Sequence, residues 1–162
     1  MKTKIISVIN QKGGVGKTTT VINLAAGLSL QKRKVLVIDL DPQGNATTGL
    51  GLSNNDTSEG TIYSVLNGSS KISDVIRKTN FNNLEIITSN VDLSGLEVET
   101  AGDTRRAFIL KDELTAYLKD SGSDYSHILI DCPPSLSLLT VMALVASNSL
   151  IVPLQTEFFA LE

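Results

Sequence analysis

Short runs of branched apolar residues alternate with longer segments of helical periodicity along the chain. Near-continuous apolar runs are typical of strands in a parallel sheet that is covered on both faces. The pattern predicts strands at 5–9, 35–39, 84–88, 128–131 and 150–153, and helices at 17–31, 61–67, 71–78, 104–120 and 135–147. This alternation predicts an α/β fold with a doubly wound, mostly parallel sheet.

The remaining segments carry weaker signals. Residues 42–60 are rich in Gly, Asn, Thr and Ser and are predicted to form a loop. Residues 158–161 resemble the start of another helix, and the chain then stops at Glu162, so we expect one domain over 1–162 that lacks its C-terminal part. The helix predicted at 104–120 has an apolar face formed by Phe108, Leu110, Leu114 and Leu118.

Composition narrows the class of protein. The chain is 41% hydrophobic and 19% charged, which is typical of a globular protein. A net charge of −3 excludes nucleic-acid binding through bulk positive charge. A single cysteine excludes an internal disulfide framework, and a single histidine disfavours a histidine-based metal site. Since no signal peptide or membrane-length apolar run is present, we expect a cytoplasmic location without membrane contact.

A glycine-rich segment between the first strand and the first helix carries the strongest chemical signal. Glycines allow a tight turn that aims several N–H groups inward, and a helix N-terminus attracts phosphate. Lys17 is predicted to reach the β- and γ-phosphates of a nucleotide, and the Thr18 hydroxyl is predicted to hold Mg²⁺. The predicted nucleotide-binding residues are Lys12, Gly13, Gly14, Val15, Gly16, Lys17, Thr18 and Thr19.

The loop departs from the general GxxxxGK[ST] pattern at its start. Gln11 occupies the first glycine position, and a second lysine, Lys12, follows it. Two cations in one loop indicate an anion between them, or a role for Lys12 toward a neighbouring molecule. The alternative is that Lys12 is an ordinary lysine on the solvated surface, without a ligand.

Acidic residues close two of the predicted strands, where doubly wound sheets bind ligands. Asp39 and Asp41 follow the second strand and are expected on one side of the sheet, although an acidic turn before Pro42 explains the spacing equally well. Asp131 ends the fourth strand in a Walker B pattern, which predicts a carboxylate for Mg²⁺. Cys132 is predicted to be a packed small residue, because it has no second Cys or His to activate it.

Three motifs together resemble the ParA/MinD family of ATPases: KGGVGKTT with its deviant Walker A lysine, DLDPQGN, and ILIDCPPS. The last two favour the ParA/Soj branch. The resemblance covers the chain from Lys4 to Glu162 and implies a P-loop NTPase fold.

By the same resemblance, Lys12 reaches the phosphates of a partner chain, and Lys17 and Asp41 are catalytic, with Asp41 orienting the attacking water. Asp39 supports the loop or orients a ligand of the metal. The box after Asp131 is switch II, with Pro133, Pro134 and Ser135.

The resemblance further implies a Mg²⁺-dependent ATPase that is slow alone and forms a homodimer when ATP is bound. The partners implied are a ParB-like DNA-binding protein and nonspecific DNA, the latter through the missing C-terminal part, with a nucleoid-associated location. Such a protein drives chromosome or plasmid segregation. Three alternatives stay open: a nucleotide-binding fragment without turnover, a MinD-like membrane-cycling ATPase, and a ParA homologue that positions another cargo.

Overall fold

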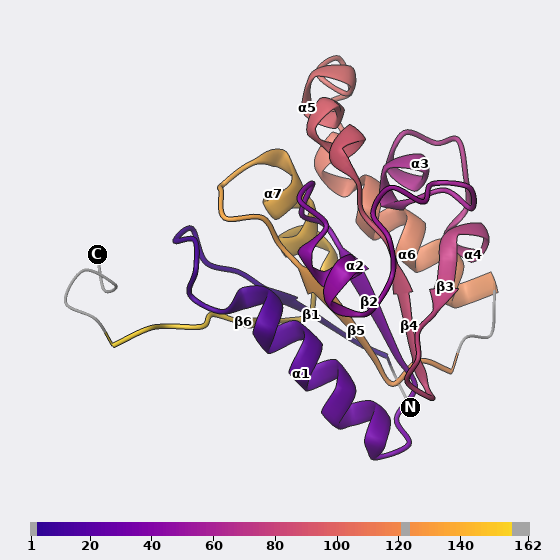
Figure 1. The fold of residues 1–162 in the computed structure, drawn as a ribbon. Coiled ribbons are helices and arrows are strands. Elements are labelled where there is room, and N and C mark those ends of the chain that lie inside the picture. The colour runs from indigo at the N-terminus through magenta and orange to yellow at the C-terminus, as the bar shows by residue number, and fades with distance from the viewer. Residues whose placement is uncertain (1–2, 121–123, 157–162) are drawn as a thin grey trace.

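The computed structural model describes residues 3–120 and 124–156. Its elements, shown in Figure 1, are β1 Lys4–Val8, α1 Lys17–Leu30, β2 Val35–Asp39, α2 Asn45–Gly49, α3 Ile62–Leu66, α4 Ile72–Val75, β3 Ile76–Lys78, β4 Leu84–Ile87, η1 Val91–Gly95, α5 Leu96–Glu99, η2 Arg106–Phe108, α6 Ile109–Asp120, β5 His127–Asp131, α7 Leu138–Ala146 and β6 Ser149–Ile151.

The strands form one sheet in the order β3-β4-β2-β5-β1-β6. All neighbouring strands are parallel except β3 and β4, which are antiparallel. The predicted α/β fold with a doubly wound, mostly parallel sheet is therefore confirmed. Because parallel strands end at the same edge, the register sets Asp39 of β2 beside Asp131 of β5, and Val8 of β1 lies on the other side of Asp131.

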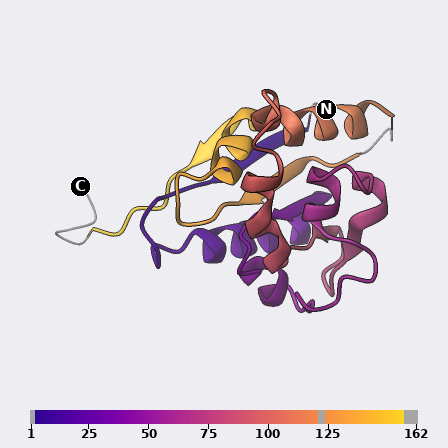
Figure 2. The ribbon, with the colours of Figure 1, turned by 90° about the horizontal axis from the view of Figure 1, so that it is seen from above.

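Helices cover both faces of the sheet (Figure 2). On one face, α1 and α2 pack against the strands through Val21, Ala25, Ala46 and Leu50. On the other face lie α3, α4, α6 and α7, which bury Leu110, Leu114 and Met142 among other side chains. Every residue of β2 is buried, which explains its almost wholly apolar sequence.

Two predicted elements are wrong in part. The predicted loop 42–60 contains the short helix α2, whose Thr47 amide and hydroxyl both donate to the buried Asp39 carboxylate. The predicted helix 71–78 ends at Val75, and its last three residues instead pair with β4 as strand β3. In both places a tertiary contact overrides the local pattern.

Two predicted helices begin later than expected. The segment 104–120 starts with the 3₁₀ turn η2, so Phe108 stays 41% exposed while Leu110 and Leu114 are buried. The helix predicted from residue 135 begins at Leu138, after Ser137, whose backbone is extended. The helix start predicted at 158–161 lies outside the described residues.

Candidate functional site: a phosphate-binding loop at the edge of the sheet

The glycine-rich loop runs from the end of β1 into the first turn of α1. Gly14 and Gly16 have φ angles of +75° and +90°, a left-handed conformation that other residues adopt only at a cost. A Cβ atom built on Gly13, Gly14 or Gly16 would have no heavy atom within 4 Å. The loop backbone therefore borders open space, which is where a ligand could approach it closely.

The amide groups of this loop are available for a ligand. The N–H groups of residues 13–19 have no hydrogen-bond acceptor among the described residues, and no side chain caps the start of α1. Unpaired amides at a helix N-terminus, together with the helix dipole, bind anions. The loop can thus hold phosphate oxygens, as its sequence predicts.

The two lysines of the loop lie in different environments. Lys17 is only 8% exposed, and its Nζ atom donates a hydrogen bond to the Lys12 carbonyl oxygen, 3.0 Å away. Lys12 is exposed, and its N–H group donates to Asn10 Oδ1 at 2.9 Å. Lys17 therefore belongs to the floor of the loop, whereas Lys12 lies on the surface of the molecule.

Thr18 and Asp131 are brought together across the sheet edge. The Thr18 hydroxyl donates to Asp131 Oδ2 at 2.7 Å, and Asp131 Oδ1 is buried without a hydrogen-bond partner. Burial raises the pKa of Asp131 to about 7, and nearby Asp39 and Asp41 add to the increase against the lowering effect of the Thr18 hydrogen bond. Oxygen ligands and an unpartnered buried carboxylate oxygen fit Mg²⁺, which prefers one or two carboxylates plus substrate phosphates.

The two acidic residues at the end of β2 differ in their burial and in their hydrogen-bond partners. Asp39 is wholly buried and accepts three hydrogen bonds, from the Thr47 amide and hydroxyl, both at 2.7 Å, and from the Asp41 amide at 3.2 Å. Burial raises the pKa of Asp39 to about 6. Asp41 lies beyond the strand and accepts from the Gln43 amide through Oδ1 at 2.9 Å. Asp39 therefore fastens α2, while Asp41 borders the same cavity as the glycine-rich loop.

These groups border one cavity of about 300 Å³. It is lined by Gly13, Gly14, Gly16, Lys17, Thr18, Thr19, Asp41, Asn45 and Pro134. Of the predicted switch II residues, Pro134 reaches the cavity and is exposed, Pro133 is buried, and Ser135 is exposed with its carbonyl accepting the Thr140 hydroxyl. Val15 is buried behind the loop.

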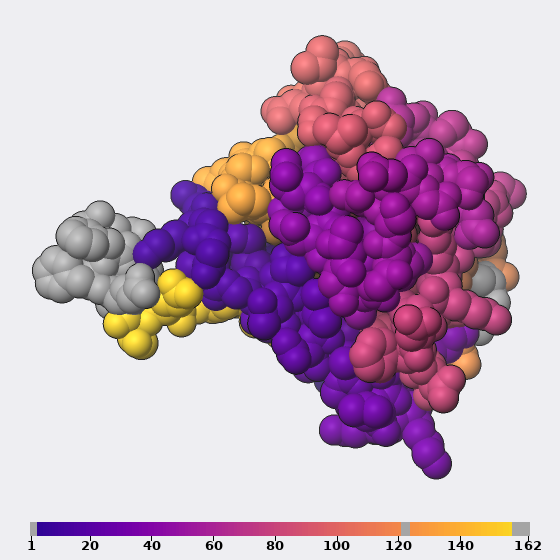
Figure 3. Space-filling model, viewed as in Figure 1, coloured from indigo at the N-terminus to yellow at the C-terminus, as the bar shows by residue number. Residues whose placement is uncertain are grey.

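The chain segment after β6 lies beside the phosphate loop, as the indigo and yellow surfaces of Figure 3 show. Asn10 Nδ2 donates to the Pro153 carbonyl at 2.8 Å, and Gln155 Nε2 donates to the Gly14 carbonyl at 3.0 Å. The final sequence segment is thus part of the site up to residue 156, where the description of this part of the chain ends.

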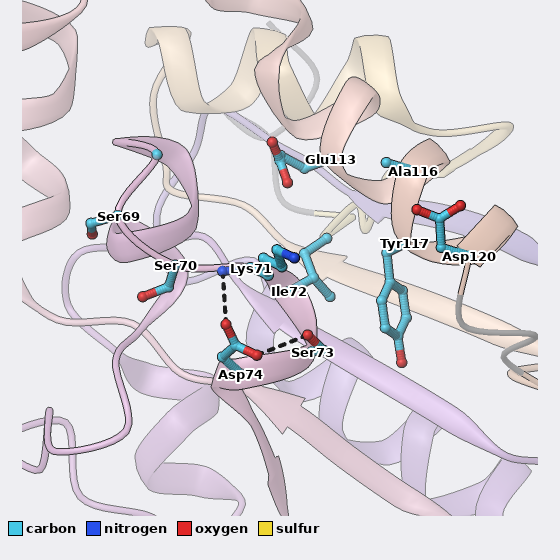
Figure 4. A pocket seen from close by; sticks show the side chains of 11 residues that line it. Ser69, Ser70, Lys71, Ile72, Ser73, Asp74, Glu113, Ala116, Tyr117 and Asp120 are labelled. Atoms are coloured by element: carbon cyan, nitrogen blue, oxygen red, sulfur yellow. Dashed lines mark hydrogen bonds between the residues drawn. The ribbon is translucent and has the colours of Figure 1, made fainter.

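A second cavity, of about 690 Å³, lies between α4 and α6 (Figure 4). Its lining includes Asp74, Glu113 and Asp120 but only one cation, Lys71. Three carboxylates would repel a polyphosphate, so this cavity does not compete for the same ligand.

Two residues outside the site behave as the sequence predicts. Cys132 is buried in the core, and burial raises the pKa of its thiol to about 12, so it remains a neutral packed side chain. His127 begins β5 at the opposite end of the strand from Asp131, and burial lowers its pKa. Neither side chain lines the phosphate cavity.

Asn45, Thr47 and Gln155 were not predicted as site residues. Asn45 lines the cavity, Thr47 completes the Asp39 anchor, and Gln155 contacts the loop. Asn45 lies in the DLDPQGN motif and could have been found from that signal. Gln155 lies in the final segment VPLQTEFFALE, whose resemblance to a ParA/Soj segment near the nucleotide is a signal for it. Nothing in the local sequence indicates Thr47, because its contact with Asp39 comes from the tertiary fold.

Residues 3–120 and 124–156 contain no helix with the length and apolar character that a membrane span requires. No group of three or more His, Cys, Asp and Glu side chains in this part of the chain could hold a metal ion. A cation at this site would therefore rely on Thr18, Asp131 and oxygens of its ligand.

The sheet and its phosphate loop define the class of protein: this is the fold of a P-loop ATPase. The chain belongs to the AAA domain family, whose sequence profile matches residues 3–162. It is 47% identical over 159 residues to the chromosome partitioning protein ParA of Caulobacter vibrioides, and 46% identical over 159 residues to the sporulation initiation inhibitor protein Soj of Bacillus subtilis. The resemblance to ParA/Soj proteins is confirmed.

These relatives are longer than the chain. The alignments cover 98% of this chain but 58% of ParA and 61% of Soj. A solved structure of cobyrinic acid a,c-diamide synthase from Mycobacterium smegmatis, with bound ATP analog and magnesium, matches with a TM-score of 0.90 and 40% identity. That match covers 98% of this chain and 63% of the synthase.

The raised pKa of Asp131 predicts a pH-dependent stability in the absence of metal. Because the folded state binds this proton more tightly than the unfolded state, whose Asp pKa is about 3.9, stability falls as pH rises through about 7. Between pH 5 and pH 8 we expect Asp131 to contribute a loss of about 2–3 kcal/mol, or about 5–10 °C in Tm. Asp39, whose pKa burial raises to about 6, adds to this loss, so Asp131→Asn should reduce the slope without removing it.

Thermal unfolding at pH 5 and pH 8, without and with Mg²⁺, measures the effect. Mg²⁺ should raise the Tm of the unmodified chain at pH 8 more than that of Asp131→Asn. Glu113→Gln, which removes a partly exposed carboxylate of the second cavity, is the matched control. Equal pH slopes for the unmodified chain and Asp131→Asn contradict the assignment.

Proposed function

We propose that this chain is the nucleotide-binding part of a partitioning ATPase that binds and hydrolyses ATP with Mg²⁺. The observation that carries the proposal is the meeting of unpaired loop amides, the buried Lys17 ammonium and the Thr18–Asp131 pair at one cavity. The names of the relatives ParA and Soj support the partitioning role. The Mycobacterium smegmatis structure carries a synthase name at lower identity, but its bound ATP analog and magnesium support the same ligands.

The loop residues bind the phosphates. Amides of residues 13–19 donate to phosphate oxygens, and the N-terminus of α1 adds its partial positive charge. Lys17 exchanges its hydrogen bond with the Lys12 carbonyl for the β- and γ-phosphate oxygens. Because Lys17 is already buried at the loop, little further ordering is needed for this contact.

Thr18 and Asp131 hold the magnesium ion. When bound, Mg²⁺ neutralises charge on the phosphate oxygens. The Thr18 hydroxyl and the unpartnered Asp131 Oδ1 are the oxygens that this chain offers to the ion. Asp39 lies beside Asp131 in the sheet register, but its hydrogen bonds to α2 and to the Asp41 amide assign it to support of the Asp41 segment.

Asp41 orients the attacking water. Its Oδ1 accepts the Gln43 amide, which fixes the carboxylate, and Oδ2 has no hydrogen-bond partner among the described residues. Asp41 lines the same cavity as the loop, so a water held by its carboxylate shares that cavity with the phosphates. Pro134, on the segment after Asp131, stiffens the neighbouring wall.

ATP binding brings two chains together in this proposal. The exposed Lys12 of each chain then completes the phosphate site of the other, as in the family that the motifs resemble. Hydrolysis is slow in the isolated chain, and a ParB-like DNA-binding protein and DNA accelerate it. The ATP-bound form associates with the nucleoid, and hydrolysis releases it.

A hydrolysis assay tests the proposal. The unmodified chain with Mg-ATP should release phosphate, and Asp41→Ala should lower the rate by about 100-fold or more, because a positioned carboxylate contributes 10²–10⁴. ATP binding should survive in Asp41→Ala. The matched control is Glu113→Gln, a carboxylate of the second cavity, which should hydrolyse at the unmodified rate.

Three outcomes would contradict parts of this proposal. Binding without turnover in the unmodified chain indicates a nucleotide-binding fragment. Full turnover in Asp41→Ala removes Asp41 from the mechanism. Nucleotide-dependent sedimentation with liposomes indicates a membrane-cycling ATPase instead.

A further inference from the structure

Residues 53–60 connect α2 to α3 and are called the strap here (Figure 1). The strap contains turns but no helix or strand. Two hydrogen bonds close its turns, from the Asp56 amide to the Ser53 carbonyl at 3.3 Å and from the Gly60 amide to the Thr57 carbonyl at 2.9 Å. Its position on the molecule therefore depends on contacts with other elements.

One anchor of the strap is Arg77 on the edge strand β3. Arg77 is only 7% exposed, and its guanidinium lies 3.2 Å from Asp56 Oδ2 and 3.6 Å from Glu59 Oε2. It also donates to the Gly60 carbonyl at 3.4 Å. A buried guanidinium keeps its charge, so it holds its carboxylate partners in place. All of these partners belong to the strap.

The other end of the strap touches the wall of the phosphate cavity. Asn54 packs directly on Gly44, where an added Cβ would lie 3.0 Å from Asn54 Cβ. Asn54 Nδ2 also donates to the Gln43 carbonyl at 3.4 Å. Gln43 and Gly44 lie between Asp41 and Asn45, which both line the phosphate cavity. The strap is thus in contact with the segment that carries Asp41.

Between these two contacts the strap stands away from the body of the protein. A cavity of about 310 Å³ lies behind it, lined by Pro42, Gln43, Asn54, Asn55, Thr57, Asn90 and Val91. Because this space is not filled by packed side chains, packing does not fix the middle of the strap. At the β3 end the strap is held by the ion pairs of Arg77, by its hydrogen bond to Gly60, and by the close approach of Gly60 to Val75 and Ser64.

We propose that Arg77 is a positioning residue for the nucleotide site: through the strap it holds Gln43 and Gly44, and with them Asp41 and Asn45. The inference rests on the proposed function, because it assigns a role in hydrolysis to a residue that lies outside the phosphate cavity. Loss of the anchor frees the strap, and the Asp41 segment loses the support of Asn54. The phosphate loop, on the other side of the cavity, keeps its own structure.

Hydrogen exchange of the nucleotide-free chain tests the restraint directly. Arg77→Met keeps the buried length of the side chain but removes both ion pairs. We expect faster amide exchange in the strap and also in residues 41–49. Arg105→Met is the control for loss of an arginine ion pair elsewhere: the exposed Arg105 pairs with Asp112 of α6, 2.9 Å apart. Faster exchange that stays confined to the strap and β3 would overturn the proposal.

Steady-state ATP hydrolysis gives a second readout. A displaced catalytic group lowers the rate without weakening phosphate binding, so Arg77→Met should lower kcat by about 10-fold or more with the KM for ATP nearly unchanged. Arg105→Met should keep both values. A rise in the KM for ATP of about 10-fold, with kcat unchanged, would assign Arg77 to nucleotide binding and overturn the positioning role.

A milder variant covers the case in which Arg77→Met does not fold. Asn54→Ala keeps the Cβ atom that lies against Gly44, but it removes the Nδ2 hydrogen bond to the Gln43 carbonyl without leaving a buried charge, and Asn54 is partly exposed. It should speed exchange in residues 41–49, and unchanged exchange there would overturn the proposal. Since exchange is read without nucleotide, it decides the inference even where the unmodified chain shows no turnover, which would contradict the proposed function alone.

Discussion

Alanine in place of Lys17 is expected to weaken ATP binding by about 10–100-fold and to abolish measurable turnover. The Lys17 ammonium is buried at the glycine-rich loop and donates a hydrogen bond to the Lys12 carbonyl. A bound phosphate would accept a hydrogen bond from the same ammonium. A hydrogen bond to a charged group is worth about 1.5–3 kcal/mol, and every 1.4 kcal/mol is tenfold in affinity. Titration with a fluorescent ATP analogue measures the loss.

Lys119→Ala is the matched control for this change. Lys119 is an exposed lysine in the last turn of α6, and its removal lowers the net charge by the same amount. It should bind ATP like the unmodified chain. Equal affinity of Lys17→Ala and Lys119→Ala would show that the nucleotide does not use the phosphate loop.

Alanine in place of Lys12 is expected to spare ATP binding but to lower turnover by about 10³-fold or more, because charge fingers supplied in trans contribute 10³–10⁵ in related phosphoryl transfer. Lys12 is exposed while Lys17 is buried, so a second chain could reach Lys12 but not Lys17. Single-turnover hydrolysis at saturating Mg-ATP measures the change.

A mixing experiment separates action within a chain from action between chains. Lys12→Ala retains Asp41, and Asp41→Ala retains Lys12, so a mixed dimer has one complete site. Equal amounts of the two inactive variants should recover about a quarter of the unmodified activity, since half of the dimers are mixed and each has one working site of two. No recovery, with both variants folded, would contradict a role for Lys12 in the partner's site.

The conformation of the glycine-rich loop could be predicted from the sequence because local chemistry dictates its shape. Gly14 and Gly16 adopt left-handed angles, and the loop lies between a strand and a helix, so the motif and its conformation coincide. Asp131 could be predicted because it ends a buried strand at the carboxyl edge of a parallel sheet. Its contact with Thr18 follows from the same topology.

Other parts could not be predicted, because they depend on contacts between distant segments. The helix α2 forms in a Gly- and Asn-rich stretch, where the buried Asp39 carboxylate satisfies the amide and hydroxyl of Thr47. Strand β3 was predicted as helix, and only its pairing with β4 reveals it. Arg77, on that strand, carried no motif at all, and its relation to the strap exists only in the folded chain.

The mass of the chain in solution shows whether ATP joins two copies of it. Light scattering should be measured with Mg-ATP, with Mg-ADP and without nucleotide. ATP-dependent pairing predicts twice the 17.3 kDa chain mass with Mg-ATP and the mass of one chain in the other two conditions. A single chain in all three conditions would contradict ATP-dependent pairing through this site.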